Sequence, residues 1–213
     1  QRSDDTVLRL NTRGHTQEDV LNAVKLTSEY DCELGLQMMT GLYGDDDDTS
    51  IETASKIIEI KPDTVRIYPT VILENTKLAR LYKEGIYEAQ TLENAVELCS
   101  ELLEMFNENN IKVIRLGLHS GGNVQEGFVS GAYHPAFREI CESKIYLQKI
   151  LEAIETDSIP KGKITVEVNR KYVSPLVGQK RSNIEKLKTM GYICNLKQND
   201  THKKYEVSVR LTK

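Results

Sequence analysis

The stretch ELGLQMMTG, residues 33–41, is a short and nearly continuous apolar run, which is typical of a parallel strand covered on both faces. Two further runs share this character: TVRIYP at residues 64–69 and IKVIRLGL at residues 111–118. Between and before them, apolar residues recur at helical spacing. The predicted helices lie at residues 20–26, 51–58, 75–84 and 92–109. This alternation predicts an α/β domain built on a parallel sheet.

The residues before the helices and the beginning of the alternating helices and strands lead to two further expectations. Thr16, with Asp19 three residues later, predicts the N-terminal cap of the first helix, and Thr49 or Ser50 is expected to cap the second. No strand pattern precedes the first helix, so the chain is expected to be a fragment of a longer protein.

The remainder divides into a connecting segment and a small domain. Residues 120–131 (SGGNVQEGFVSG) are glycine-rich and irregular, and His134-Pro135 opens an amphipathic helix that runs to about residue 155. After a linker at residues 157–162, the pattern predicts a strand, two helices and two strands, at residues 163–169, 172–177, 182–190, 192–198 and 204–212. The predicted domains are therefore residues 1–118, 119–159 and 160–213.

The formal net charge of −4 hides a split between these parts. Residues 160–213 hold 13 Lys and Arg against 4 Asp and Glu, a net of +9, whereas residues 1–159 hold 15 against 28, a net of −13. With 39% hydrophobic and 28% charged residues, the composition excludes disordered and collagen-like proteins. No apolar run reaches the roughly 20 residues that span a bilayer, so a cytoplasmic location and no membrane partner are expected.

The sequence predicts no metal site. Its cysteines, at positions 32, 99, 141 and 194, form no CxxC pair, and its four histidines form no HxxxH pair. The carboxylate run DDDD at residues 45–48 follows a predicted strand, where it would either hold Mg²⁺ or Ca²⁺ or favour the next helix N-terminus. Because no second ligand cluster accompanies the run, the helix interpretation is favoured.

Two basic motifs are candidate anion sites. RGHT at residues 13–16 places a cation just before the start of a helix. The motif would serve either as a helix cap or as a contact for an anion. In the tail, Gly178, Lys180 and Arg181 join two predicted helices, where they would grip a sugar-phosphate backbone as the GXXG loop of KH modules does. Arg181 stands in place of the second glycine, and an ordinary helix C-cap is the alternative. The charge of +9 favours the RNA interpretation.

Several motifs resemble the second half of the radical S-adenosylmethionine (SAM) barrel. They are QRSDDTVLRLNTRGHT at residues 1–16, MMTGL at 38–42, RIYPT at 66–70 and GAYHPAFRE at 131–139. In order and spacing they are similar to the Elongator catalytic subunit-like and the oxygen-independent coproporphyrinogen oxidase-like members of that superfamily. Tyr43 replaces the proline of the usual GLPG turn. Gln37 replaces an acid found in some relatives, which favours the Elongator-like group.

The resemblance implies the C-terminal part of a partial (β/α)6 TIM-like barrel, and the tail adds a small α+β, KH-like C-terminal domain. The parent enzyme would hold SAM and a [4Fe-4S] cluster, and with an electron donor protein it would cleave SAM to a 5′-deoxyadenosyl radical. The three cluster cysteines lie in the first half of such proteins. This chain is therefore expected to be inactive by itself.

By the same resemblance, three polar residues contact the cofactor. Gln1 matches the end of the fourth barrel strand, Arg13 the loop before the next helix, and Gln37 the fifth strand. Amides pair with ribose hydroxyls, and arginine binds a carboxylate through two hydrogen bonds. Tyr68 or residues 120–131 would border the substrate cavity, and no catalytic residue is assigned.

Three functional hypotheses follow. The first is the C-terminal portion of a radical SAM enzyme whose basic tail presents RNA, in particular tRNA. The second is a non-enzymatic RNA-binding protein on a decayed barrel, and the third is a protein-docking fragment. RNA binding predicts a salt-dependent RNA affinity that falls when Lys180 and Arg181 are replaced by alanine. An RNA affinity that these substitutions leave unchanged would favour protein docking.

Overall fold

The computed structural model describes residues 2–119 and 126–212. By their contacts the residues form two units, residues 1–137 (unit 1) and residues 138–213 (unit 2). Over the described ranges, no helix combines the length and the apolar character that a membrane span requires.

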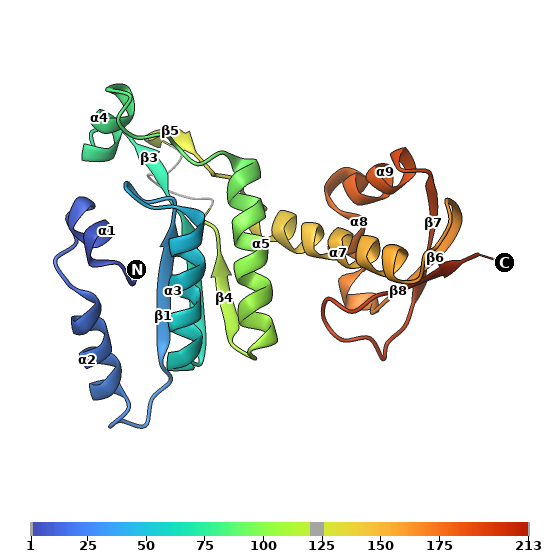
Figure 1. The fold of residues 1–213 in the computed structure, drawn as a ribbon, viewed down its shortest axis with the longest axis horizontal. Coiled ribbons are helices and arrows are strands. Elements are labelled where there is room, and N and C mark those ends of the chain that lie inside the picture. The colour runs from blue at the N-terminus through green and yellow to red at the C-terminus, as the bar shows by residue number, and fades with distance from the viewer. Residues whose placement is uncertain (1, 120–125, 213) are drawn as a thin grey trace. The chain divides into compact units, whose positions relative to one another are not determined.

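Unit 1 is built on a parallel sheet of three strands in the order β1-β2-β4. The strands are β1 (Gly35–Thr40), β2 (Thr64–Pro69) and β4 (Lys112–Leu116). Helices α3 (Asp47–Ile60) and α5 (Leu92–Glu108) lie against the same face of this sheet (Figure 1). The predicted α/β class with a parallel sheet is therefore confirmed.

The core of unit 1 lies between the sheet and these two helices. Met38, Val65 and Ile67 are fully buried and alternate with more exposed neighbours, because successive side chains of a strand point to opposite faces. The helices contribute further buried side chains, among them Ala54, Ile57, Leu98, Leu102 and Phe106. The prediction that residues 33–41 are covered on both faces is wrong for this chain. Gln37 is exposed, and the second face of the sheet is open.

Two helices precede the sheet. Helix α1 (Asp5–Leu10) was not predicted, whereas α2 (Gln17–Thr27) begins with the expected capping box of Thr16 and Asp19. Helix α3 starts earlier than its predicted caps, because the Asp46 side chain accepts a hydrogen bond from the backbone N–H of Thr49.

A small antiparallel ribbon pairs β3 (Val71–Leu73) with β5 (Phe128–Gly131). With α4 (Lys77–Lys83) it forms a separate apolar cluster of Ile72, Ala79 and Tyr87. The sequence predicted an irregular segment at residues 120–131. Residues 128–131 instead form a strand, and residues 120–125 lie outside the described part of the chain.

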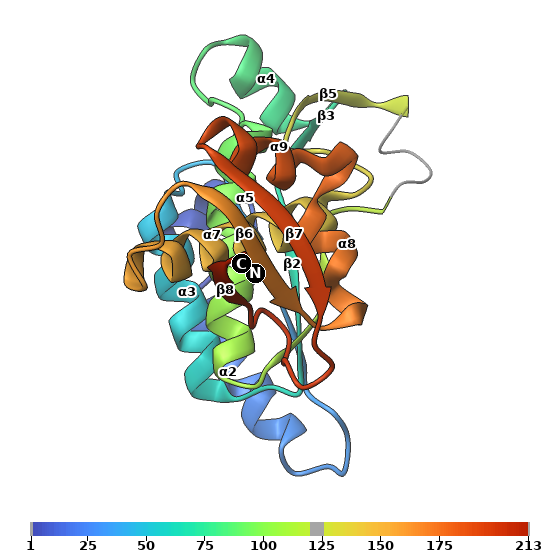
Figure 2. The same ribbon diagram turned by 90° about the vertical axis from the view of Figure 1, so that its right-hand side faces the viewer.

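Unit 2 packs helices against a mixed sheet ordered β7-β6-β8, in which β6 is parallel to β7 and antiparallel to β8 (Figure 2). Its elements in chain order are α7 (Phe137–Thr156), β6 (Gly162–Val168), η1 (Arg170–Tyr172), α8 (Val173–Val177), η2 (Gln179–Arg181), α9 (Ser182–Thr189), β7 (Tyr192–Gln198) and β8 (Ser208–Leu211). The predicted order of a strand, two helices and two strands is observed.

One face of this second sheet is buried. Ile164, Val166 and Val168 alternate inward along β6, and the helices supply fully buried side chains that include Ile145, Tyr146, Ile150, Leu176 and Leu187. The backbone N–H of Tyr205 donates to the Tyr146 hydroxyl at 3.0 Å, which ties the loop before β8 to α7.

Candidate functional site

The open face of the parallel sheet carries polar side chains in register. Gln37 on β1 pairs with Arg66 on β2, which pairs with Arg115 on β4. In the next row Met39 pairs with Tyr68. Register partners in a parallel sheet point to the same face. The sequence-predicted residues Gln37 and Tyr68 therefore share the surface that α3 and α5 leave uncovered.

Arg13 reaches the same face from the loop between α1 and α2. Its Nη2 donates to Sδ of Met39 at 3.6 Å. The loop is shaped by Thr12, which has a left-handed φ of 57°, and by a hydrogen bond of 2.9 Å from the Arg13 N–H to the Leu8 carbonyl. The structure thus places Arg13 and Gln37, two of the three predicted cofactor contacts, on the same face of the sheet. The third, Gln1, lies outside the described residues.

Asn11, which no sequence pattern singled out, fastens this loop to the turn after β1. Its Nδ2 donates to the carbonyls of Val7 and Tyr43, each at 2.8 Å, and its Oδ1 accepts from the Tyr43 N–H at 3.2 Å. The Tyr87 hydroxyl, whose pKa burial raises to about 12, donates to the Gly41 carbonyl at 2.6 Å. Side chains distant in sequence therefore fix the turn that carries Tyr43.

A cavity of about 310 Å³ opens at the carboxyl end of β1 and β2, lined by Arg13, Thr70 and Lys77 among others. Within the described ranges, Arg13 Nε and Thr70 Oγ1 are buried and have no hydrogen-bond partner. Native proteins rarely leave buried polar atoms unsatisfied, so these two atoms indicate a polar ligand. Lys77 adds a second cation, and its Nζ donates to the Leu10 carbonyl at 3.2 Å.

This lining is suited to binding rather than to acid–base chemistry. Two cations and a hydroxyl match a ligand that bears a carboxylate or phosphate and hydroxyl groups. The residues around the cavity include no Asp, Glu or His. Nor do the described residues contain a group of three or more His, Cys, Asp and Glu side chains suited to hold a metal ion.

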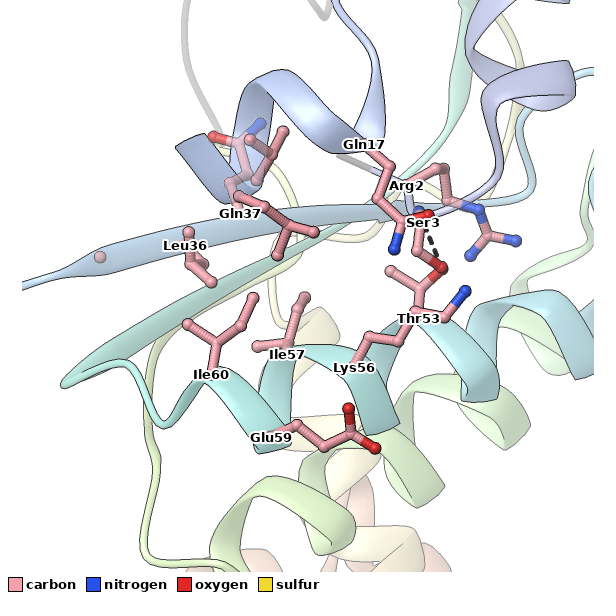
Figure 3. Close-up of a pocket in the computed structure, with 13 residues that line it drawn as sticks. Arg2, Ser3, Gln17, Leu36, Gln37, Thr53, Lys56, Ile57, Glu59 and Ile60 are labelled. Atoms are coloured by element: carbon pink, nitrogen blue, oxygen red, sulfur yellow. Dashed lines mark hydrogen bonds between the residues drawn. The ribbon is translucent and has the colours of Figure 1, made fainter. Parts of the chain in front are cut away.

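A larger groove of about 610 Å³ runs beside the free edge of β1 (Figure 3). Leu36 points toward Ile57 and Ile60 of α3, whereas Gln37 points to the opposite side of the strand. Helix α2 contributes Leu21 to the groove, and no side chain of α2 is buried. Over the part of the chain that the structure describes, an unpaired edge of β1 and apolar side chains therefore lie together here.

The carboxylates that follow β1, at residues 45–48, form an ion pair and a helix cap within unit 1. Asp45 forms an ion pair with Arg2, and neither side chain has exposed surface. Arg2 also donates to Ser50 Oγ at 2.8 Å and to Thr49 Oγ1 at 3.0 Å. Burial lowers the pKa of Arg2 to about 10, so the guanidinium remains protonated at neutral pH. Hydrogen bonds from the Thr49 hydroxyl and N–H lower the pKa of Asp46, which caps α3.

In unit 2 the loop between α8 and α9 contains all three predicted RNA contacts. Lys180 and Arg181 have left-handed φ values of 49° and 63°, and both side chains are exposed. Gly178 instead packs inside the unit, because a Cβ at this position would lie 2.7 Å from Ser143 Oγ. Asn183 holds the loop to α7 by donating to the Ser143 carbonyl at 2.7 Å. The loop therefore displays two cations, and its glycine has a packing role.

Gly178→Ala is expected to lower the free energy of unfolding of unit 2 by about 2–3 kcal/mol, through the contact with Ser143 and the φ of 78°. Gly162→Ala, in the same unit, is the control, since its φ of 147° is also unfavourable for alanine and an added Cβ would meet nothing within 4 Å. It should cost only the backbone strain, about 1 kcal/mol. Urea unfolding measures both, and equal losses would contradict the packing role.

Comparison with known proteins finds relatives for part of this chain. Residues 62–147 match the Radical_SAM C-terminal domain. The tRNA uridine(34) acetyltransferase of Methanocaldococcus jannaschii is 33% identical over 97 residues, which is 44% of this chain and 18% of that protein. The Elongator complex protein 3 of Homo sapiens is 28% identical over 104 residues, 47% of this chain and 19% of that protein. The chain thus spans under a fifth of these relatives.

A solved structure shares the fold. The archaeal Methanocaldococcus infernus Elp3 with an N-terminal deletion (1–46) superposes with a TM-score of 0.60 and 20% sequence identity, over 81% of this chain and 38% of that chain. The resemblance that the sequence motifs predicted is confirmed: the chain is similar to the Elongator-type radical SAM proteins, and its residues 62–147 match the Radical_SAM C-terminal domain.

Proposed function

We propose that this chain is the C-terminal portion of a radical SAM [4Fe-4S] enzyme that modifies RNA, in particular tRNA. The observation that carries the proposal is the open sheet face that Arg13 and Gln37 share, beside a cavity with two buried polar atoms that lack partners among the described residues. The match of residues 62–147 and the relatives named as tRNA uridine(34) acetyltransferases support it.

The residues present fit a SAM-type ligand. Arg13 would hold the carboxylate through its free Nε and its Nη groups, Gln37 would pair with a ribose hydroxyl, and Thr70 would satisfy a further polar atom. When bound, SAM and the cluster supply the 5′-deoxyadenosyl radical. The three cluster cysteines would come from the rest of the parent protein, because Cys99 and Cys141 are fully buried here and Cys32 and Cys194 alone are too few.

The free edge of β1 supports a barrel that continues beyond this chain. In the proposed partial (β/α)6 barrel, a preceding strand pairs with β1 and covers the groove between α2 and α3, beside Leu21, Leu36 and Ile60. That covering explains why α2 has an apolar stripe and yet buries no side chain here. We expect the parent protein, reconstituted with iron and sulfide, to show a broad thiolate-to-iron charge-transfer absorbance. A colourless reconstituted protein would refute the cluster.

In the same proposal, the KH-like unit 2 binds RNA through Lys180 and Arg181, whose side chains carry the exposed charge of the α8–α9 loop. Replacing both by alanine is expected to weaken binding of a short RNA and to reduce the slope of log K against log salt by about 2, one for each lost phosphate contact. Fluorescence anisotropy at several salt concentrations measures the slope.

A matched control is available in the same unit. Lys197 and Arg210 both pair with Glu167, at 3.3 and 2.9 Å, so the double alanine variant removes the same charge from groups that already have a partner. It should leave the slope nearly unchanged. If the loop variant binds RNA as the control does, the loop is not an RNA site and the protein-docking alternative gains.

A further inference from the structure

Arg66 and Arg115 stand side by side on the open face of the parallel sheet. They are register partners on β2 and β4, so their Cα atoms lie about 4.8 Å apart and their side chains leave the same face. A Cβ at Gly35 would lie 4.0 Å from Arg66 Nη1, which places the guanidinium over the surface of β1. The Arg66 guanidinium thus reaches toward β1, while Arg115 leaves the same face from the neighbouring strand on the other side of β2.

The two guanidinium groups lack a counter-charge among the described residues. Within those residues neither forms an ion pair or a side-chain hydrogen bond. The three strands hold no Asp or Glu, and Lys112 in the row beside Arg66 adds a third cation. Residues 1–159 as a whole have 28 acidic and 15 basic residues. The open face of the sheet thus carries three cations and no carboxylate from its own strands, in a part of the chain that is acidic overall.

Arginine side chains are long enough for two of them on neighbouring strands to turn toward one anion that binds between them. Neighbouring guanidiniums form paired N–H donors that match the oxygens of a phosphate. Gln37 continues the same row and supplies an amide, and Tyr68 lies in the next row. In the row Gln37-Arg66-Arg115, the two arginines can therefore donate hydrogen bonds to one phosphate group, and the Gln37 amide can bind the nucleoside attached to it.

We propose that Arg66 and Arg115 together bind one phosphate of the RNA substrate on the open sheet face. This inference rests on the proposed function, since it assigns the substrate side of the same surface whose cofactor side includes Arg13. The phosphate would lie beside Gln37, which keeps the attached nucleotide near the cofactor. The loop of Lys180 and Arg181 in unit 2 is a separate contact.

The test compares the RNA affinity of this chain with that of single alanine variants at Arg66 and Arg115. With a short single-stranded RNA, each variant should bind at least about tenfold more weakly, and its salt slope should fall by about 1. The double variant should bind little more weakly than either single variant, because both groups hold one phosphate. Arg80→Ala, an exposed cation of α4, is the control and should bind as the unmodified chain does.

Two outcomes would overturn the inference. One is that the Arg66 and Arg115 variants bind RNA as Arg80→Ala does. The other is that AMP binds with the same arginine dependence while RNA does not, which would assign the site to a free mononucleotide. Failure of the proposed function is seen separately. A parent protein that cleaves no SAM, while RNA binding still depends on both arginines, would leave this phosphate site standing.

Discussion

Asp45→Ala is expected to lower the free energy of unfolding of unit 1 by about 3–5 kcal/mol. The reason is the buried ion pair with Arg2, in which neither side chain has exposed surface. Arg2 is charged at neutral pH, because its pKa in the intact protein is about 10, and removing the carboxylate leaves this buried guanidinium without its ion-pair partner. The Thr49 hydroxyl, which donates to Asp45 Oδ1 at 2.8 Å, also loses an acceptor. Urea unfolding monitored by circular dichroism measures the loss.

The double variant Arg2→Met with Asp45→Ala separates charge from packing. If the cost comes from the unpaired charge, removing both partners should recover much of the stability, because an apolar pair of similar volume replaces a buried ion pair at little cost. Asp48→Ala is the control within the same acidic run, since this side chain is exposed, and should cost less than about 1 kcal/mol. Equal losses in the double and single variants would contradict the ion-pair account.

Arg13→Ala in the parent protein is expected to weaken SAM binding by about 10- to 150-fold, equivalent to about 1.5–3 kcal/mol for hydrogen bonds to a charged group. Arg13 is placed for this role by Asn11 and Met39, and its Nε is buried and unsatisfied within the described ranges. Isothermal titration with SAM measures the affinity. Gln37→Ala should cost less, about 5-fold, because it removes a neutral hydrogen bond.

Two variants keep this prediction specific. Arg13→Lys retains the charge but loses the paired donors, so its affinity should fall between those of the wild type and Arg13→Ala. Arg9→Ala removes an exposed cation of α1 and should leave SAM affinity unchanged. Unchanged affinity in Arg13→Ala would remove this residue from the cofactor site.

Local patterns in the sequence were enough to predict the strands, the long helices and the capping box at Thr16, because each depends on residues within a few positions. The α/β class and the family resemblance are confirmed on that basis. Local patterns could not show how many faces of the parallel sheet are covered by helices. The apolar run around Met38 and Met39 does not show that only one face is packed.

The features that the sequence did not reveal depend on distant pairings. The Arg2–Asp45 ion pair and the Asn11 contacts join segments that no periodicity connects. The row Gln37-Arg66-Arg115 depends on strand register, which shifts between Val65 and Arg66, so spacing along the chain would misplace Arg115. The ribbon of β3 and β5 consists of short strands with little pattern of their own.

The central claim is that this chain completes a radical SAM enzyme through Arg13 and Gln37. The direct measurement is release of 5′-deoxyadenosine by the reconstituted parent protein after reduction with dithionite in the presence of SAM. The account predicts release by the wild type, none by the isolated chain, and a strongly reduced amount from Arg13→Ala at limiting SAM. A reconstituted parent protein that forms its cluster and releases no 5′-deoxyadenosine would contradict it.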